Sequence, residues 1–133
     1  MVAPVLSADQ LRDVVQRYAA VASSSDADAY AALFTEDASQ IDPYPAPARV
    51  GREAIRDFIK SSFDACEAMR VEWIEVYPVA DRVAFTFHIT LNLAGGSAMH
   101  IRGVEIFTVT DDGLISFVEA YWGQDDVTLE EVA

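Results

Sequence analysis

The sequence is poor in the residues that mark several classes of functional site. It has one cysteine, Cys66, so an internal disulfide is excluded and a reducing compartment is favoured. On a helical face such a cysteine is more often a small buried hydrophobe than a nucleophile. The only histidines are His88 and His100, no carboxylate cluster has ligand spacing, and no glycine-rich phosphate loop is present. We therefore expect neither a metal nor a cofactor.

Basic residues are also scarce. Nine lysines and arginines stand against 22 aspartates and glutamates, which gives a net charge of −13. Because phosphates would be repelled, neither nucleic acid nor an anionic membrane is an expected partner. We interpret the acidic tail from Asp125 to Glu131 as a solvated surface. No apolar run has membrane-spanning length and no secretory signal is present, so we expect a cytoplasmic protein.

The remaining residues predict one domain over residues 1–133 that begins with three helices. Apolar residues make up 52% of the chain, enough for a single core. The first helix runs from a Ser7 cap to about Ser23, and Asp26 or Asp28 caps a short second one. Residues 35–37 are expected to form a turn into a strand. The third helix begins near Arg52.

After residue 70 the hydrophobic period becomes two. Strands are predicted over 71–79, 83–93, 98–110 and 114–122, with turns between them. Helices followed by a long meander predict an α+β fold, in which three helices pack on a strongly curved antiparallel or mixed sheet. Such a sheet makes a cone whose mouth can hold a small apolar ligand.

Asp42 stands where a short apolar strand meets a proline-rich loop. It follows Ile41, and Pro43 fixes φ and removes a backbone donor, so the strand cannot simply continue. The carboxylate is therefore placed at the rim of a sheet, beside a loop that can shield it from water. We interpret Asp42 as a general base, although Asp-Pro is also a frequent turn opener.

Glu105 is a charged residue inside an apolar row. A period of two places it on one face with Gly103 and Phe107, and burying it ionised and unpaired would cost several kcal/mol. It would sooner take up a proton, and a neutral acid can donate a hydrogen bond to a developing oxyanion. In the alternative interpretation Val104 and Ile106 face inward and Glu105 lies in water.

Several short elements occur in a characteristic order. They are Val15-Gln16-Arg17-Tyr18, Ile41-Asp42-Pro43-Tyr44, Gly51-Arg52-Glu53-Ala54-Ile55, Val104-Glu105-Ile106 and Glu119-Ala120-Tyr121-Trp122. With them the chain resembles the Δ5-3-ketosteroid isomerases over nearly its whole length. These enzymes belong to the nuclear transport factor 2-like superfamily, which also holds scytalone dehydratase and SnoaL-type polyketide cyclases.

The resemblance implies an isomerase that moves a C=C bond from Δ5 to Δ4 in a small apolar 3-oxosteroid. Asp42 matches the family's proton-shuttling aspartate, and Tyr18 matches the tyrosine that donates to the C3 oxygen. By default, a tyrosine on the apolar stripe of a helix is a core residue. Glu105 falls where the family has a second donor, an aspartate that its apolar site keeps neutral. A neutral Glu105 is therefore implied by the resemblance. The implied substrate-binding residues are Phe58, Phe107, Val118 and Trp122.

The chain also departs from the family. The second donor is Glu rather than Asp, one methylene longer, and the tyrosines that support the first donor appear as Phe34 and Ile59. A gapless match would turn His88 and Thr90 into the pocket. The alternation over 85–93 argues instead for a one-residue slip, compensated at the Gly95-Gly96 turn, which leaves His88 on the outer face.

Two alternatives stay open. One is a SnoaL-like cyclase, dehydratase or epoxide hydrolase that uses Asp42 on another polycyclic substrate. The other is a non-catalytic steroid-binding or dimerisation module. A homodimer through the outer sheet face is expected in either case. Its predicted contact residues are Val104, Ile106, Phe117 and Tyr121.

Overall fold

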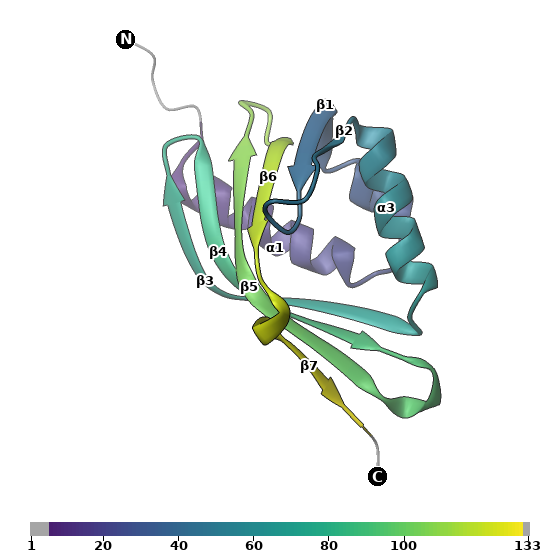
Figure 1. Cartoon of the computed structure of the whole chain (residues 1–133). Coiled ribbons are helices and arrows are strands. Elements are labelled where there is room, and N and C mark those ends of the chain that lie inside the picture. Colours follow the sequence, from purple (N-terminus) through teal and green to yellow (C-terminus); the bar gives the residue numbers. More distant parts are fainter. Residues whose placement is uncertain (1–5, 132–133) are drawn as a thin grey trace.

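A computed structural model describes residues 6–131 of the chain. Three helices and seven strands follow one another in a single layered unit (Figure 1). The helices are α1 (Ala8–Ala22), α2 (Ala27–Ala31) and α3 (Arg52–Asp64). The strands are β1 (Phe34–Ile41), β2 (Arg49–Val50), β3 (Ala68–Val79), β4 (Arg82–Asn92), β5 (Ala98–Val109), β6 (Ile115–Tyr121) and β7 (Val127–Glu130), with short 3-10 turns η1 (Ala94–Gly96) and η2 (Gln124–Asp126).

The first two helices begin where side chains satisfy free backbone N–H groups. At α1 the Ser7 hydroxyl accepts from the Gln10 N–H at 3.1 Å, and the Gln10 side chain accepts from the Ser7 N–H at 2.7 Å. This reciprocal pair confirms the predicted capping box. At α2 the Asp26 carboxylate accepts from the Ala29 N–H at 3.0 Å, so Asp26 is the cap rather than Asp28.

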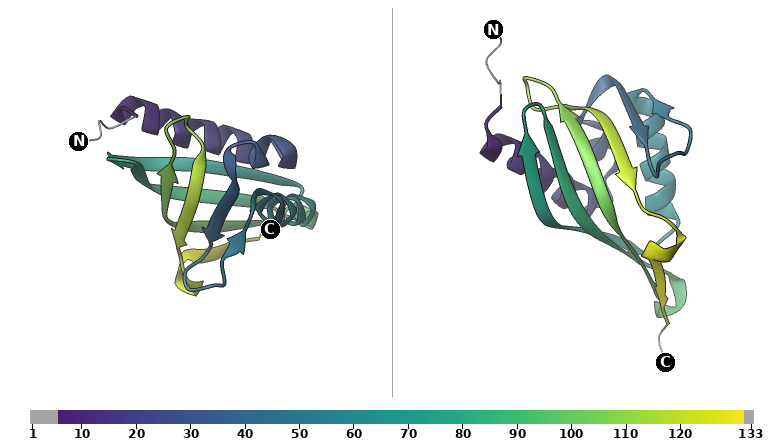
Figure 2. Two further views of the ribbon diagram at one scale, coloured as in Figure 1. Left: turned by 90° about the horizontal axis from the view of Figure 1, so that it is seen from above. Right: turned by 60° about the vertical axis from the view of Figure 1, so that its left-hand side comes forward.

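The strands form one curled sheet in the order β2-β1-β6-β5-β4-β3, with β7 paired to the start of β5. The β1–β6 pair is parallel and the other pairs are antiparallel. The helices lie on the concave face, and the other face carries no helix in the described chain (Figure 2). The sheet is therefore mixed and unclosed, and the predicted α+β cone is confirmed.

A close backbone approach occurs where β5 and β6 pass one another. A Cβ atom on Gly103 would lie 2.4 Å from the Tyr121 carbonyl oxygen and 3.0 Å from the Trp122 Cβ. Real Cβ atoms are not found so close to backbone, so only glycine fits here. Gly103 thereby brings the end of β6, and Trp122 after it, against the concave side of β5.

One sequence expectation was wrong, and one segment has structure that the sequence did not predict. Residues 35–37, expected as a turn, belong to β1. The pairing of β1 with β6 shifts register between Phe34 and Ser39, so these polar residues stay extended but step out of the ladder. In the acidic tail the side chains are exposed as expected, yet residues 127–130 form β7 against β5. Backbone pairing with a neighbouring strand orders both segments, and composition alone does not reveal it.

The alternation of β4 agrees with the prediction. Phe85 and Phe87 are buried, and the next residues on their side are Ile89 and Leu91. His88 therefore lies on the outer face, as expected. The pairing between β4 and β5 runs without a register shift along its length. Within residues 6–131, no helix is both long and apolar enough to cross a membrane.

Candidate active site

A cavity of about 130 Å³ lies between the helices and the concave face of the sheet. Its wall is mostly apolar, with a few polar groups, the usual composition of a small-molecule site. Tyr18 from α1, Asp42 from the end of β1 and Glu105 from β5 all reach it. The full lining is Tyr18, Ala22, Tyr30, Asp42, Phe58, Ile59, Ser62, Met69, Val71, Phe87, Ile89, Leu91, Ile101, Glu105 and Trp122. The three predicted catalytic residues therefore share one cavity, although they are distant in sequence.

Glu105 is buried, with 2% of its surface exposed. Its Oε1 lies 3.1 Å from the Tyr18 hydroxyl, and Oε2 has no hydrogen-bond partner among the described residues. Burial raises the pKa of Glu105 well above its usual value, the charge of Asp42 raises it further, and the Tyr18 hydroxyl lowers it in part. Burial thus favours the neutral form of the carboxyl, and the interpretation that leaves Glu105 in water is excluded.

Tyr18 is fixed by aromatic packing on the buried side of α1. Its ring meets the Phe107 ring edge-on at 4.9 Å between centroids and the Phe85 ring at 5.9 Å. Burial raises the pKa of Tyr18 well above its usual value, and the nearby Glu105 adds to this. The hydroxyl therefore remains a neutral donor, and it donates to Glu105 Oε1 at 3.1 Å.

Tyr30 is a residue of the site that the sequence did not single out. It lines the same cavity from α2, and its ring centroid lies 5.8 Å from that of Tyr18 and 5.2 Å from that of Phe34. Burial raises its pKa. The sequence showed it only as one apolar position of a short helix. A buried tyrosine needs a polar neighbour for its hydroxyl, and this was the one available signal.

Asp42 is set at the rim by groups on two sides. The Trp122 indole N–H donates to Asp42 Oδ1 at 3.0 Å, and Arg49 Nη1 lies 3.5 Å from the Asp42 carbonyl oxygen. Burial raises the pKa of Asp42, while the Trp122 hydrogen bond and the charge of Arg49 lower it. Burial is the largest of these effects, so the pKa of Asp42 lies above its usual value, and the other two effects limit the rise.

Arg49 was missed by the sequence interpretation. Its guanidinium carbon lies 3.4 Å from the centroid of the Phe58 ring, and Nη1 is also 3.5 Å from Gln40 Oε1. The cation therefore stacks on one wall residue while it faces the backbone of Asp42. Arg49 begins the short strand β2, directly after a segment rich in proline and alanine, and nothing in the sequence distinguishes it from a solvated arginine.

The four implied substrate-binding residues fall into two groups. Phe58 and Trp122 line the cavity. Phe107 and Val118 have no exposed surface and belong to the core behind the lining. Ile59 also lines the cavity, whereas Phe34 is not in the lining and packs against Tyr30. Direct substrate contact by these side chains stays a prediction.

The sequence model of the SnoaL-like domain family matches residues 15–118 of the chain. The chain belongs to the SnoaL-like domain family. This SnoaL-like protein is 33% identical over 121 residues to a steroid Delta-isomerase of Nocardioides simplex, a match that covers 90% of this chain and 95% of that protein.

Solved structures give the same fold. An epoxide hydrolase/cyclase-like enzyme of pyran ring formation in salinomycin superposes with a TM-score of 0.83 at 25% identity, over 91% of this chain and 96% of that one. A Mycobacterium tuberculosis protein in complex with estradiol-17β-hemisuccinate superposes with a TM-score of 0.79 at 23% identity, over 90% and 98% of the two chains. The SnoaL-like protein therefore has the nuclear transport factor 2-like fold predicted from its sequence.

Proposed function

We propose that this SnoaL-like protein is a steroid Δ-isomerase that moves a C=C bond from Δ5 to Δ4 in a 3-oxosteroid. The observation that carries the proposal is the hydrogen-bonded Tyr18–Glu105 pair, buried in the cavity that Asp42 also lines. The relative from Nocardioides simplex supports it, because that protein is a steroid Delta-isomerase. The chain thus offers two neutral donors and one ionisable base to one small apolar ligand.

In the proposed reaction Asp42 removes a proton from C4 and negative charge moves onto the C3 oxygen as a dienolate. Tyr18 and Glu105 donate hydrogen bonds to that oxygen, and Asp42 then returns the proton at C6. Fixed donors in a dry site are often the largest catalytic effect, worth roughly 10²–10³-fold for each donor removed. General base catalysis by a positioned side chain typically contributes about 10²–10⁴-fold.

The size of the cavity limits how the substrate is held. Its volume of about 130 Å³ is smaller than the roughly 300 Å³ at which ordinary ligand sites begin. In our proposal the reacting rings, which carry C3 to C6, occupy the deep part near Glu105, and the remaining rings extend through the mouth. Apolar contacts with Phe58 and Trp122 would orient the rings at this end.

The test is conversion of 5-androstene-3,17-dione to its conjugated enone, followed by ultraviolet absorbance. Asp42→Asn removes the base and keeps the volume, so we expect its rate to fall by about 10²–10⁴-fold with an unchanged circular dichroism spectrum. Asp37→Asn makes the same change at an exposed position of β1, the strand that precedes Asp42, and serves as the control. Isomerisation by Asp42→Asn at the rate of the control would overturn the assignment of the base.

A protein that only binds steroids would behave differently. Equilenin, a phenolic steroid, resembles the charge-delocalised dienolate and should use both donors of an isomerase. We expect its affinity to fall after Tyr18→Phe. If wild type and this variant bind equilenin equally, and neither forms enone, the chain is a binding module.

A second candidate is an epoxide hydrolase or cyclase, which the superposition on the salinomycin enzyme favours. Here Asp42 would activate water or a substrate hydroxyl, with Tyr18 and Glu105 on the oxygen that accumulates charge. Opening of a polycyclic epoxide by wild type without any enone formation would favour this candidate.

We also propose a homodimer through the outer sheet face. Val104 and Tyr121 remain 37% and 40% exposed there, although both are apolar or aromatic. Tyr121 also packs against the exposed ring of Tyr44, at 5.8 Å between centroids. A second copy would cover these side chains. We place the protein in the cytoplasm, where its single Cys66 would stay reduced.

A further inference from the structure

Gln40 is a buried polar side chain that the proposed reaction does not use. It is 2% exposed, as is Glu105. Burying an amide costs free energy unless its oxygen and its nitrogen find hydrogen-bond partners. An apolar side chain of the same size would fill the position without that cost. The partners of the Gln40 amide therefore indicate its role.

The register of β1 directs Gln40 toward the inside of the cone. Ala38 and Gln40 are buried on one face of the strand, and Asp42, two residues further on, lines the cavity on the same side. On β2, Arg49 is the cross-strand partner of Gln40, and its Nη1 lies 3.5 Å from Gln40 Oε1. The same nitrogen lies 3.5 Å from the Asp42 carbonyl oxygen. The Gln40 amide thus contacts the cation beside the proposed base.

The second polar neighbour of Gln40 is Tyr30 on α2. Tyr30 is 2% exposed and lines the cavity, and its ring centroid lies 5.8 Å from that of Tyr18. Burial raises the pKa of Tyr30 and Glu105 raises it further, whereas hydrogen bonding with Tyr18 and with Gln40 opposes that rise. Tyr30 therefore connects the Gln40 amide to the Tyr18 hydroxyl, which lies 3.1 Å from Glu105 Oε1.

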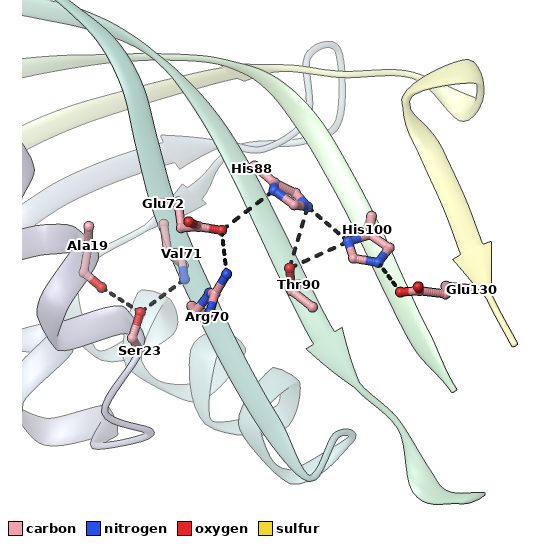
Figure 3. A network of polar contacts seen from close by, with 9 residues as sticks. All are labelled: Ala19, Ser23, Arg70, Val71, Glu72, His88, Thr90, His100 and Glu130. Carbon is pink, nitrogen blue, oxygen red and sulfur yellow. Dashed lines mark hydrogen bonds and ion pairs between the residues drawn. The ribbon is translucent and has the colours of Figure 1, made fainter. Parts of the chain in front are cut away.

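The backbone and the hydroxyl of Tyr18 are fixed separately. At the end of α1 the Ser23 hydroxyl donates to the Ala19 carbonyl oxygen at 2.8 Å and accepts from the Val71 N–H at 2.9 Å (Figure 3). This contact ties the helix to β3, but it does not reach the hydroxyl at the far end of the Tyr18 side chain. The polar neighbours inside the cavity set the direction of that hydroxyl.

We propose that Gln40 and Tyr30 are positioning residues, which hold the Tyr18 hydroxyl in place through a continuous chain of polar contacts. The inference rests on the proposed isomerase, in which Tyr18 donates to the substrate oxygen. Hydrogen bonds in a chain polarise one another inside a protein, so each one strengthens the next. Tyr30 enters this chain from α2, whereas the positions of the supporting tyrosines in the resembled enzymes hold Phe34 on β1 and Ile59 on α3.

The experiment measures enone formation from 5-androstene-3,17-dione by Tyr30→Phe and Gln40→Met. The first change removes a hydroxyl and keeps the ring, and the second removes the amide and keeps a side chain of similar length. We expect kcat to fall by about 2–10-fold in each variant, the usual contribution of one hydrogen bond, with KM nearly unchanged. Tyr77→Phe and Gln16→Met make the same changes at exposed positions and should keep the wild-type kcat.

A double-mutant cycle separates positioning from direct catalysis. If Tyr30 acts through Tyr18, Tyr30→Phe causes no further loss in protein that already carries Tyr18→Phe. Gln40→Met should lose its effect in that background for the same reason. A loss that multiplies with that of Tyr18→Phe would show that Tyr30 acts on the substrate directly, and the proposal would be overturned.

A measurement without substrate separates this inference from the proposed function. In protein isotope-labelled at the hydroxyl-bearing ring carbon of tyrosine, the nuclear magnetic resonance signal of Tyr18 reports the hydrogen bonding of its hydroxyl. We expect this signal to shift in Tyr30→Phe and in Gln40→Met, but not in Tyr77→Phe or Gln16→Met. A shifted signal in a protein that forms no enone would uphold the positioning of Tyr18 and refute the isomerase. Enone formation with the wild-type kcat in both variants would refute the positioning role alone.

Discussion

Replacing Glu105 by glutamine tests the central electrostatic feature of the cavity. The side chain is 2% exposed, and its Oε2 has no hydrogen-bond partner in the described chain. Glutamine has nearly the same shape, keeps an N–H donor and cannot ionise. The variant therefore separates the charge of Glu105 from its volume and from its hydrogen bond to Tyr18.

The expected magnitude follows from proton linkage. The pKa of Glu105 is raised in the folded protein above the value near 4.5 of a free carboxyl, chiefly by burial. Below pH 4.5 the Glu105 carboxyl is protonated in both the folded and the unfolded chain, so its burial costs no stability through ionisation. As the pH rises toward the folded pKa, only the unfolded chain ionises, and the free energy of unfolding falls. Each pH unit over which only the unfolded chain ionises costs about 1.4 kcal/mol. If the carboxyl stays neutral to pH 7, wild type loses about 3 kcal/mol that the Glu105→Gln variant keeps.

The assay is urea unfolding, followed by tryptophan fluorescence, at several pH values from 4.5 to 8. Other groups titrate alike in both proteins and cancel in the difference between their free energies of unfolding. We expect this difference to grow with pH in favour of Glu105→Gln, while Glu131→Gln shows no such trend. A difference that does not change with pH would mean that Glu105 is already ionised in the folded protein. An ionised Glu105 could not donate a hydrogen bond to the oxyanion.

The catalytic consequence of the same change is equally specific. Glu105→Gln keeps a donor facing the substrate oxygen, whereas Glu105→Ala removes it. We expect the alanine variant to lose roughly 10²–10³-fold in kcat and the glutamine variant to lose clearly less. Equal losses in both variants would show that the acid proton itself, rather than a hydrogen-bond donor, is required.

Three further changes test other parts of the structure. Gly103→Ala places a Cβ 2.4 Å from the Tyr121 carbonyl oxygen, and the strain should cost about 1–3 kcal/mol in urea unfolding. Arg49→Met removes a charge that lowers the pKa of Asp42, so the acidic limb of the kcat/KM profile should move to higher pH. Val104→Glu places a charge in the exposed patch of the outer face and should convert a dimer to monomers in sedimentation experiments.

Each of these changes has a matched control. Gly123→Ala meets its nearest neighbour at 3.8 Å and should leave stability unchanged, so an equal loss in both glycine variants would argue against a local clash. Arg49→Lys keeps the charge and should restore the wild-type profile. Val50→Glu introduces the same charge at another exposed valine on β2. A Val104→Glu protein that sediments as wild type would place the dimer contact elsewhere.

Much of the fold was predictable because the hydrophobic period changes along the chain. The helical period in the N-terminal half predicts helices, and the period of two after residue 70 predicts strands. Together they predict helices packed on a sheet. Residues 35–37 were missed because they are polar and a neighbouring strand orders their backbone. Residues 127–130 include Val127, Thr128 and Leu129, which favour a strand, but acidic residues on both sides dominate the composition of the tail.

The candidate site was predictable in part and for different reasons. Glu105 stood out because a carboxylate interrupted an apolar row, and its burial follows from the alternation of β5. Asp42 and Tyr18 gained meaning mainly from the resemblance. Tyr30 and Arg49 could not be found, because their importance lies in contacts across elements. A tyrosine in a short helix and an arginine in a two-residue strand carry no pattern of their own.

The proposed reaction requires two carboxyl groups of one cavity to take opposite protonation states. Burial disfavours the charged form of each. At Asp42 the Trp122 N–H at 3.0 Å and the charge of Arg49 oppose this effect, whereas at Glu105 only the Tyr18 hydroxyl opposes it. Glu105 faces a tyrosine hydroxyl and the negative charge of Asp42. Once Asp42 has lost its proton, that charge makes the Glu105 proton harder to remove. Ionising the base thus helps to keep the donor neutral. One cavity can then accept a proton at its rim while it donates hydrogen bonds from its depth, which is what proton transfer next to a carbonyl group requires.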